Sequence, residues 1–392
     1  MAAALLATAG CNAILGNDRH NLAPAGNDGG IAGAGGAAGT GAGGAAGAGG
    51  VGGAAGAAGS GGAGGGAACG ARGQPCCSGS CDLRASCDGT ACIAADVWSA
   101  TADGTYHFNG GTWNQPLLSG STAPLPSVTA MWGTSATFVV GAGSGFMLRN
   151  DGLGWHKDSI SGVSVGMGTL SAVSGANATD VWAVGDTYFA HWNGSSWASV
   201  TLPQAVVPYY AVWISGPGEG WAVGEEGTMA QLSGGTWTDR GHSSNGYAYY
   251  GIWGSAATDV YAVGQRHTLS GTPLYIRHYG NATACDGGPC WSDLTPMADP
   301  SGTMLPMHAV WGSDASHVWV VGEGGQVLFW NGSVWTAPLT GAGSSETLLA
   351  VWGSGPRDVW VAGSAGARHY NGTMWSPVPG LGAATTIWLS AN

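Results

Sequence analysis

The chain has few charged residues and very few basic ones. Only 8% of its 392 residues are charged, and one lysine and nine arginines stand against 22 acids, for a net charge of −12. Nucleic acid is bound through clustered Lys and Arg, so this balance excludes it as a partner class. The same shortage excludes docking on anionic lipid through a basic face. No apolar run approaches the roughly 18 residues of a membrane-spanning helix, so we expect membrane contact only through a lipid anchor.

Large side chains are missing from the first part of the chain. All 20 Trp lie at or after Trp98, and the stretch from Gly29 to Ala68 is almost entirely Gly and Ala. Such a stretch cannot bury a core and keeps high backbone entropy. Residues 12–68 are therefore predicted to be a disordered, flexible tether.

The residues before the tether carry a short motif, Leu5-Leu-Ala-Thr-Ala-Gly-Cys11. It resembles the end of a bacterial lipoprotein signal peptide, which implies a signal and anchor over residues 1–11 and lipid modification of Cys11. Thr8 and the lack of a basic residue before Cys11 depart from that pattern. The alternative is an unmodified cysteine. With the anchor, the tether would hold a folded head away from the bilayer.

Six further cysteines fall within residues 69–92, a segment too short for a hydrophobic core. Three disulfides would stabilise such a module, and they imply export to an oxidising compartment. Zinc is disfavoured because the segment lacks His and paired CxxC motifs. The spacing resembles knottin-type modules, and the pairing is left open. Two more cysteines are expected to close a loop further along the chain. The predicted disulfide cysteines are Cys69, Cys76, Cys77, Cys81, Cys87, Cys92, Cys285 and Cys290.

One pattern recurs about every 40 residues over the rest of the chain. Its clearest copy reads Ala350-Val-Trp-Gly-Ser, Asp358-Val-Trp-Val-Ala-Gly, His369-Tyr-Asn-Gly and Trp375. Copies begin around Trp132, Val173, Trp213, Trp253, Trp311 and Trp352, at spacings of 41, 40, 40, 58 and 41 residues. Each copy contains four short apolar runs separated by Gly-rich turns, and its Asn-Gly pair predicts a type I′ hairpin. No helical period is present.

This repeat predicts an all-β fold, a β-propeller over residues 93–392. Six units are complete. Asp96–Trp113 matches strands two to four of a seventh, and Thr386–Ser390 matches a first strand. We therefore expect seven blades with a composite closing blade; the alternative is six blades with an appended hairpin. A small disulfide-rich module and a disordered tether would precede the propeller.

Residues repeated in every blade are expected to build the blade. The recurrent Trp side chains would pack between blades. The recurrent histidines (His107, His191, His278 and His369) lie on different blades, too far apart for one zinc, so we expect each to hydrogen-bond a neighbouring turn. The recurrent Asp residues are expected to accept hydrogen bonds in their turns. No metal site and no cofactor is predicted.

Ligand contacts are therefore sought among residues that do not repeat. Tyr-rich segments and the disulfide-closed loop of the long unit are typical of adaptable binding loops. The alternative is packing at blade junctions. Glu225-Glu226 and Glu323 occupy equivalent turns and would add negative charge to one face. The candidate binding residues are Tyr209, Tyr210, Tyr247, Tyr249, Tyr250 and Asp286.

The overall pattern resembles secreted bacterial lipoproteins that join a Gly/Ala tether, a Cys-rich module and a Trp-Gly-Ser propeller, with kelch-, Asp-box- and tectonin-like repeats. It predicts a monomeric, non-enzymatic binding propeller, because no nucleophile-plus-base set is present. We expect an outer-membrane or cell-surface lipoprotein, or otherwise a periplasmic or extracellular protein. Its partner would be an extracellular protein or glycan. The alternatives are a carbohydrate-binding lectin and a glycosidase-type enzyme.

Overall fold

The computed structural model describes residues 96–389 with internal gaps, together with the backbone of two short strands before them. The described segments are 85–87, 92–94, 96–108, 112–163, 168–186, 188–201, 207–241, 246–266, 274–280, 289–295, 305–338, 343 and 345–389. Cys11, the tether, Cys285 and Asp286 lie outside them, as do Cys69, Cys76, Cys77 and Cys81. No helix in the described segments is long and apolar enough to cross a membrane.

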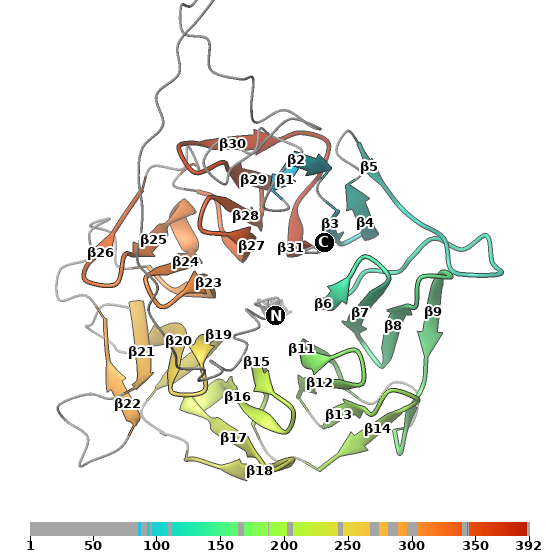
Figure 1. Ribbon diagram of the computed structural model, residues 1–392, viewed down its shortest axis with the longest axis horizontal. Coiled ribbons are helices and arrows are strands. Elements are labelled where there is room, and N and C mark those ends of the chain that lie inside the picture. Colours follow the sequence, from blue (N-terminus) through green and yellow to red (C-terminus); the bar gives the residue numbers. More distant parts are fainter. Residues whose placement is uncertain are drawn as a thin grey trace, which may run out of the picture. The chain divides into compact units, whose positions relative to one another are not determined.

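Within the described segments, seven antiparallel sheets form the blades of a β-propeller, with their innermost strands around a common centre (Figure 1). Blades 1 to 7 follow the chain, and their strands are listed from the centre outward. Blade 1 is β31 (Ala384–Leu389), β3 (Val97–Thr101), β4 (Gly104–Phe108), β5 (Trp113–Asn114); blade 2 is β6 (Ala130–Ser135), β7 (Phe138–Gly143), β8 (Phe146–Asn150), β9 (Trp155–Asp158); blade 3 is β11 (Leu170–Asn177), β12 (Asp180–Gly185), β13 (Phe189–Trp192), β14 (Trp197–Val200); blade 4 is β15 (Tyr209–Gly216), β16 (Glu219–Gly224), β17 (Met229–Ser233), β18 (Thr236–Asp239); blade 5 is β19 (Tyr247–Ala256), β20 (Asp259–Arg266), β21 (Leu274–Gly280), β22 (Cys290–Asp293); blade 6 is β23 (Met307–Asp314), β24 (His317–Gly322), β25 (Val327–Trp330), β26 (Trp335–Thr336); blade 7 is β27 (Leu348–Gly355), β28 (Asp358–Gly363), β29 (Gly366–Tyr370), β30 (Trp375–Val378).

Five short elements complete the described secondary structure. β10 (Ile160–Ser161) adds a parallel fifth strand to the outer edge of blade 3. β1 (Ala85–Cys87) pairs with β2 (Cys92–Ala94) in a separate hairpin, where the backbones of Cys87 and Cys92 are opposite each other. Two single-turn 3-10 helices, η1 (Glu225–Gly227) and η2 (Glu323–Gly325), follow β16 and β24.

Blade 1 closes the ring with strands from both ends of the described chain. β31 pairs antiparallel with β3, and Trp388 is opposite Trp98. Both indoles are buried, and the Ser99 hydroxyl donates to the Thr386 carbonyl over 2.6 Å. The seven-blade prediction with a composite closing blade is confirmed, and the six-blade alternative is excluded.

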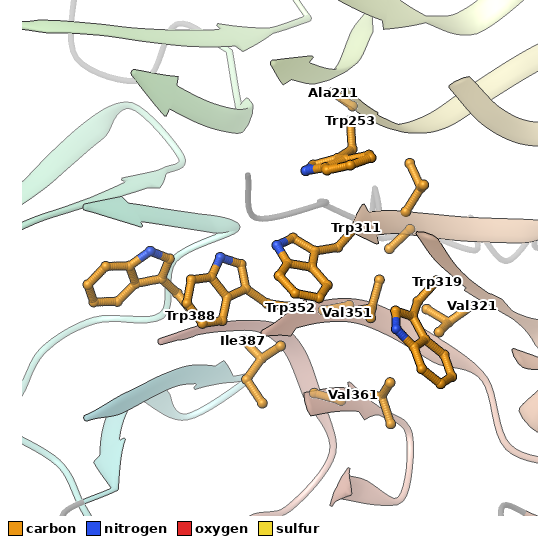
Figure 2. Packing of buried hydrophobic residues seen from close by; sticks show 14 of the residues in the cluster. Ala211, Trp253, Trp311, Trp319, Val321, Val351, Trp352, Val361, Ile387 and Trp388 are labelled. Atoms are coloured by element: carbon orange, nitrogen blue, oxygen red, sulfur yellow. The ribbon is translucent and has the colours of Figure 1, made fainter. Parts of the chain in front are cut away.

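Adjacent blades interlock through a Trp on one innermost strand and a Gly on the next. A Cβ added at Gly254 would lie 2.8 Å from the Trp213 ring, and one added at Gly312 would lie 2.6 Å from the Trp253 ring. The glycines therefore give each indole room against the neighbouring backbone. Figure 2 shows Trp311, Trp352 and Trp388 lying side by side in this inner layer.

Blade 3 departs from this rule and corrects the repeat register. Ser174, not Val173, occupies the position of the innermost Trp, because Ser174 pairs with Trp182 as Trp213 pairs with Trp221. On the next blade the matching Gly is replaced by Ile214. The Ile214 N–H donates to the Ser174 hydroxyl over 3.1 Å. The smaller Ser is thus matched by a larger neighbour.

The Asn-Gly hairpins also differ from the expected type I′ turn. In blade 3, Trp192 pairs with Trp197, and the Asn193 side chain accepts the N–H groups of Ser195 and Ser196. Only Gly194 has a positive φ there, +93°, whereas a type I′ turn needs two such residues. The hydrogen bonds to the Asn193 side chain therefore stabilise this turn without a second residue of positive φ.

Candidate functional site

The candidate site lies at the end of the ring where the innermost strands begin, called here the strand-start face. In blades 3 to 7 a β-bulge near the start of the innermost strand inserts one extra residue, and blade 1 has a similar irregularity. A bulge leaves this residue outside the regular pairing and redirects its side chain. All six side chains are half-buried between buried neighbours. They are Ser171, Tyr210, Tyr250, His308, Leu349 and Thr385.

Three consecutive blades place an aromatic ring at this bulge. The ring centroids of Tyr210 and Tyr250 lie 5.7 Å apart, and those of Tyr250 and His308 lie 5.5 Å apart. These distances fall within the contact range of aromatic pairs. Tyr210, Tyr250 and His308 therefore form one continuous surface feature across blades 4 to 6, called here the aromatic arc.

A polar side chain stands beside each ring of the aromatic arc. The Tyr210 hydroxyl donates to Glu225 Oε2 over 2.8 Å, and Gln265 Nε2 donates to the Tyr250 hydroxyl over 2.6 Å. His308 Nε2 lies 3.7 Å from Glu323 Oε1. Glu225 and Glu323 directly follow the Gly that ends the second strand of their blade, and Gln265 follows Gly264 within β20.

Two turns hold the carboxylates in equivalent positions. The Glu225 N–H donates to the Pro208 carbonyl, and the Glu323 N–H donates to the Pro306 carbonyl, at 3.0 and 3.1 Å. Each residue begins a 3-10 turn, η1 or η2. The predicted equivalence of these two turns on one face is confirmed. The exposed Glu226 in η1 has a φ of +51°, where η2 has Gly324.

Burial controls the protonation of Tyr210 and His308. It raises the pKa of Tyr210, and the Glu225 carboxylate raises it further, so this phenol remains a neutral donor. Burial also lowers the pKa of His308 to about 4, because the imidazole has only 12% of its side chain exposed. His308 is therefore neutral at pH 7.

The six predicted binding residues separate into different environments. Tyr210 and Tyr250 belong to the aromatic arc. Tyr209 is fully buried against Phe189, and Tyr249 is 2% exposed, so both are part of the core in this structure. Tyr247 is half-buried and stacks on Tyr275 at 4.6 Å.

Asp286 itself is not among the described residues. The described residues on either side, Gly280 and Cys290, are paired at the opposite end of blade 5 from Tyr250. Cys290 is disulfide-bonded. Its predicted partner Cys285 lies outside the described residues, so their pairing stays a prediction.

His308 was not predicted from the sequence, although a signal for it exists. His308-Ala-Val-Trp, Tyr210-Ala-Val-Trp and Tyr250-Gly-Ile-Trp have the same register within their repeats. Aligning the units on the following Trp would have placed His308 with the two tyrosines. Gln265 was missed because its role depends on a contact with Tyr250, not on a repeated motif.

The four recurrent histidines hydrogen-bond the Asp at the start of the second strand of their own blade. His107 pairs with Asp96, His191 with Asp180 at 2.8 Å, His278 with Asp259 at 2.5 Å and His369 with Asp358 at 2.5 Å. Each imidazole also lies against an aromatic ring, as His191 does against Trp182 at 4.1 Å. The predicted hydrogen bonding to a turn is confirmed.

Two of these pairs include a serine, in an order unlike that of a catalytic triad. Asp358 bonds both Ser354 and His369, so the carboxylate stands between the hydroxyl and the imidazole. In a triad the imidazole must contact the hydroxyl in order to take its proton. This set therefore stabilises the blade. Among the described residues, no group of three or more His, Cys, Asp or Glu side chains is arranged to hold a metal ion.

Comparison with known proteins gave structural similarity only. No family model matches the chain, and no curated protein sequence matches it. YCF48 from Cyanidioschyzon merolae has a TM-score of 0.47 and 16% identity, covering 64% of this chain and 84% of its own. A structure titled YCF48 bound to D1 peptide has a TM-score of 0.49 and 16% identity, covering 71% and 86%.

Proposed function

We propose that this protein is a non-enzymatic binding propeller that receives a protein partner on the strand-start face, around the aromatic arc. The propeller would be exported, lipid-anchored through Cys11 and carried on the tether of residues 12–68. The observation that carries the proposal is the aromatic arc itself.

The aromatic arc is unlike the positions that build the blades. The innermost Trp and its facing Gly recur because every blade junction needs the same packing. The bulge position carries Ser171, Leu349 and Thr385 in other blades, so folding does not require an aromatic ring there. Half-buried rings with two rotatable side-chain bonds lose little conformational entropy on docking, which favours recognition.

Site-specific crosslinking tests the location of the binding surface. The full chain, purified from its native host, would carry a photoreactive phenylalanine at Tyr210 or Tyr250, with Thr236 on the outer strand β18 as the control position. We expect protein crosslinks from both positions of the aromatic arc and none from Thr236. Crosslinks from Thr236 alone would refute the assignment of the surface.

A glycan array and a panel of glycoside substrates test the class of function. Saturable glycan binding that is lost in Tyr250→Ala would favour the lectin alternative. Turnover of a glycoside would refute a non-enzymatic role.

Mass spectrometry of the mature protein tests the anchor and the disulfides separately. We expect a lipid-modified Cys11 and no free thiol among the remaining eight cysteines. An unmodified Cys11 would reject the anchor, and free thiols in residues 69–92 would reject the disulfide module.

A further inference from the structure

The aromatic arc presents a particular chemistry to a ligand. The Tyr210 proton is directed to Glu225, so that phenol does not offer its hydrogen outward. The aromatic arc then offers ring surface, carboxylate oxygens and the Tyr250 hydroxyl, which accepts from Gln265. Glu323 keeps 45% of its side chain exposed, and Glu226 in the same type of turn is exposed.

Positive charge on these blades is committed elsewhere. Of the described arginines on blades 4 to 6, Arg240 donates to Gln231 Oε1 and Arg277 donates to the Trp291 carbonyl, each over 2.9 Å. The third is Arg266, directly after Gln265. Its guanidinium lies over the rings of Tyr247 and Tyr275, at 5.2 and 4.9 Å, and 3.3 Å from Asp293. Among the described residues, Glu323 has no Lys or Arg within ion-pair distance, and its neighbour His308 is neutral at pH 7.

His308 provides an independent observation at the same place. Its Nδ1 is buried and has no hydrogen-bond partner among the described residues. A buried polar atom without a partner calls for an explanation such as an absent water or ligand. The Glu323 carboxylate, 3.7 Å from Nε2, favours the tautomer that carries the proton on Nε2, and in that tautomer Nδ1 is an acceptor whose missing partner is a hydrogen-bond donor.

Ring faces, carboxylates and an unfilled acceptor are together complementary to a cation that carries N–H donors. A guanidinium or ammonium group gains cation–π attraction over such rings and an ion pair with the carboxylates. An anionic group would be repelled by the same carboxylates. We infer that the aromatic arc binds a Lys or Arg side chain of the partner polypeptide, which deepens the proposed function and rests on it.

Blocked peptides test this inference by calorimetric titration at low salt. The probes are acetyl-(Gly-Arg)3-amide and acetyl-(Gly-Lys)3-amide, with the Gln and Glu versions as comparison peptides. We expect saturable binding of the Arg and Lys peptides, weakening with added salt, and none of the Gln or Glu peptides. Equal binding of the Gln peptide, or no binding of any basic peptide, would overturn the inference.

Charge-neutralising variants locate the effect. Glu323→Gln and Glu225→Gln should each weaken binding of the Arg peptide about fivefold or more. Asp103→Asn is the matched control, because Asp103 is an exposed acid in the equivalent second-to-third-strand turn of blade 1. An equal loss in Asp103→Asn would show a general charge effect and refute the site.

Two further measurements keep the outcomes separate. Thermal melting of each variant checks folding, and Glu226→Gln, at an exposed side chain, replaces any variant that fails to fold. Crosslinks at Tyr210 and Tyr250 without binding of basic peptides would refute the cation inference and leave the proposed function standing. Absence of both would refute both.

Discussion

At the scale of single residues, Asp358 connects three other side chains of blade 7. It accepts hydrogen bonds from Ser354, Trp360 and His369. Both Asp358 and His369 are buried. Because Trp360 and His369 are buried and cannot reach water, their indole N–H and imidazole Nε2 depend on this one carboxylate.

Asp358→Ala should therefore lower the stability of the protein. Removing one member of a buried polar network costs about 3 kcal/mol or more, which corresponds to about 6 °C in melting temperature. Asp259→Ala is the matched control, since Asp259 bonds Ser255 and His278 in a more exposed setting. Calorimetric melting should show a clearly larger loss for Asp358→Ala. Equal losses would contradict the role of burial.

His308 should make the folded protein sensitive to acid. Its pKa is about 4 in the folded state against 6.5 for an ordinary imidazole, so the unfolded state binds the proton first. The stability contribution is fully present above pH 6.5 and is lost as the pH falls to about 4. The loss reaches about 3 kcal/mol. In His308→Gln, the fall in melting temperature between pH 7.5 and 4.5 should be smaller than in the wild type, and an identical fall would refute the assignment.

At the scale of elements, the blades are joined by the Trp–Gly contact between innermost strands. Gly312→Ala would place a methyl group 2.6 Å from the Trp253 ring and 2.8 Å from the His317 carbonyl oxygen. Overpacking of this kind costs about 1–3 kcal/mol. Gly355→Ala is the control, because a Cβ there meets nothing within 4 Å. Melting curves should separate the two variants, and a tolerated Gly312→Ala would contradict the proposed junction.

The sequence predicted these elements well wherever one residue type repeats for one physical reason. The Trp, the Asp of the second strand and the Asn-Gly pair were sufficient for the strand order and for the composite blade. Blade 3 was misaligned by one residue because Ser174 is compensated by Ile214, which lies 40 residues away and was not compared with it. The prediction of a type I′ turn was wrong because the Asn193 side chain accepts the N–H groups of the turn. Asn193 therefore does not need the left-handed backbone that a type I′ turn would require.

The candidate site was predicted only in part for a related reason. Tyr210 and Tyr250 were identified by residue type, yet so were their buried neighbours Tyr209 and Tyr249. A β-bulge decides which Tyr of each pair turns outward, and composition does not reveal a bulge. His308 belongs to the arc because its blade lies next to that of Tyr250, so that the two rings are in contact. This contact between blades is seen in the folded structure and not in the sequence of a single repeat.

At the scale of the whole molecule, the ring depends on the pairing of β31 with β3. Trp388→Ala should cost about 3–5 kcal/mol, as do other deletions of large buried aromatic side chains. The Trp388 side chain is 1% exposed and contacts the neighbouring Trp352. We expect a melting temperature lower by several degrees in calorimetry. An unchanged curve would mean that ring closure contributes little to stability.

The pairing of β31 with β3 also has a consequence in time. Val97 pairs with Leu389, so the two sides of blade 1 are synthesised 292 residues apart. At about 5–20 residues per second, β3 waits roughly 15–60 s on the ribosome before its partner strand exists. During that interval one edge of β3 and the indole of Trp98 lack their native partners, so an unpaired strand edge is open to incorrect pairing until β31 has been synthesised.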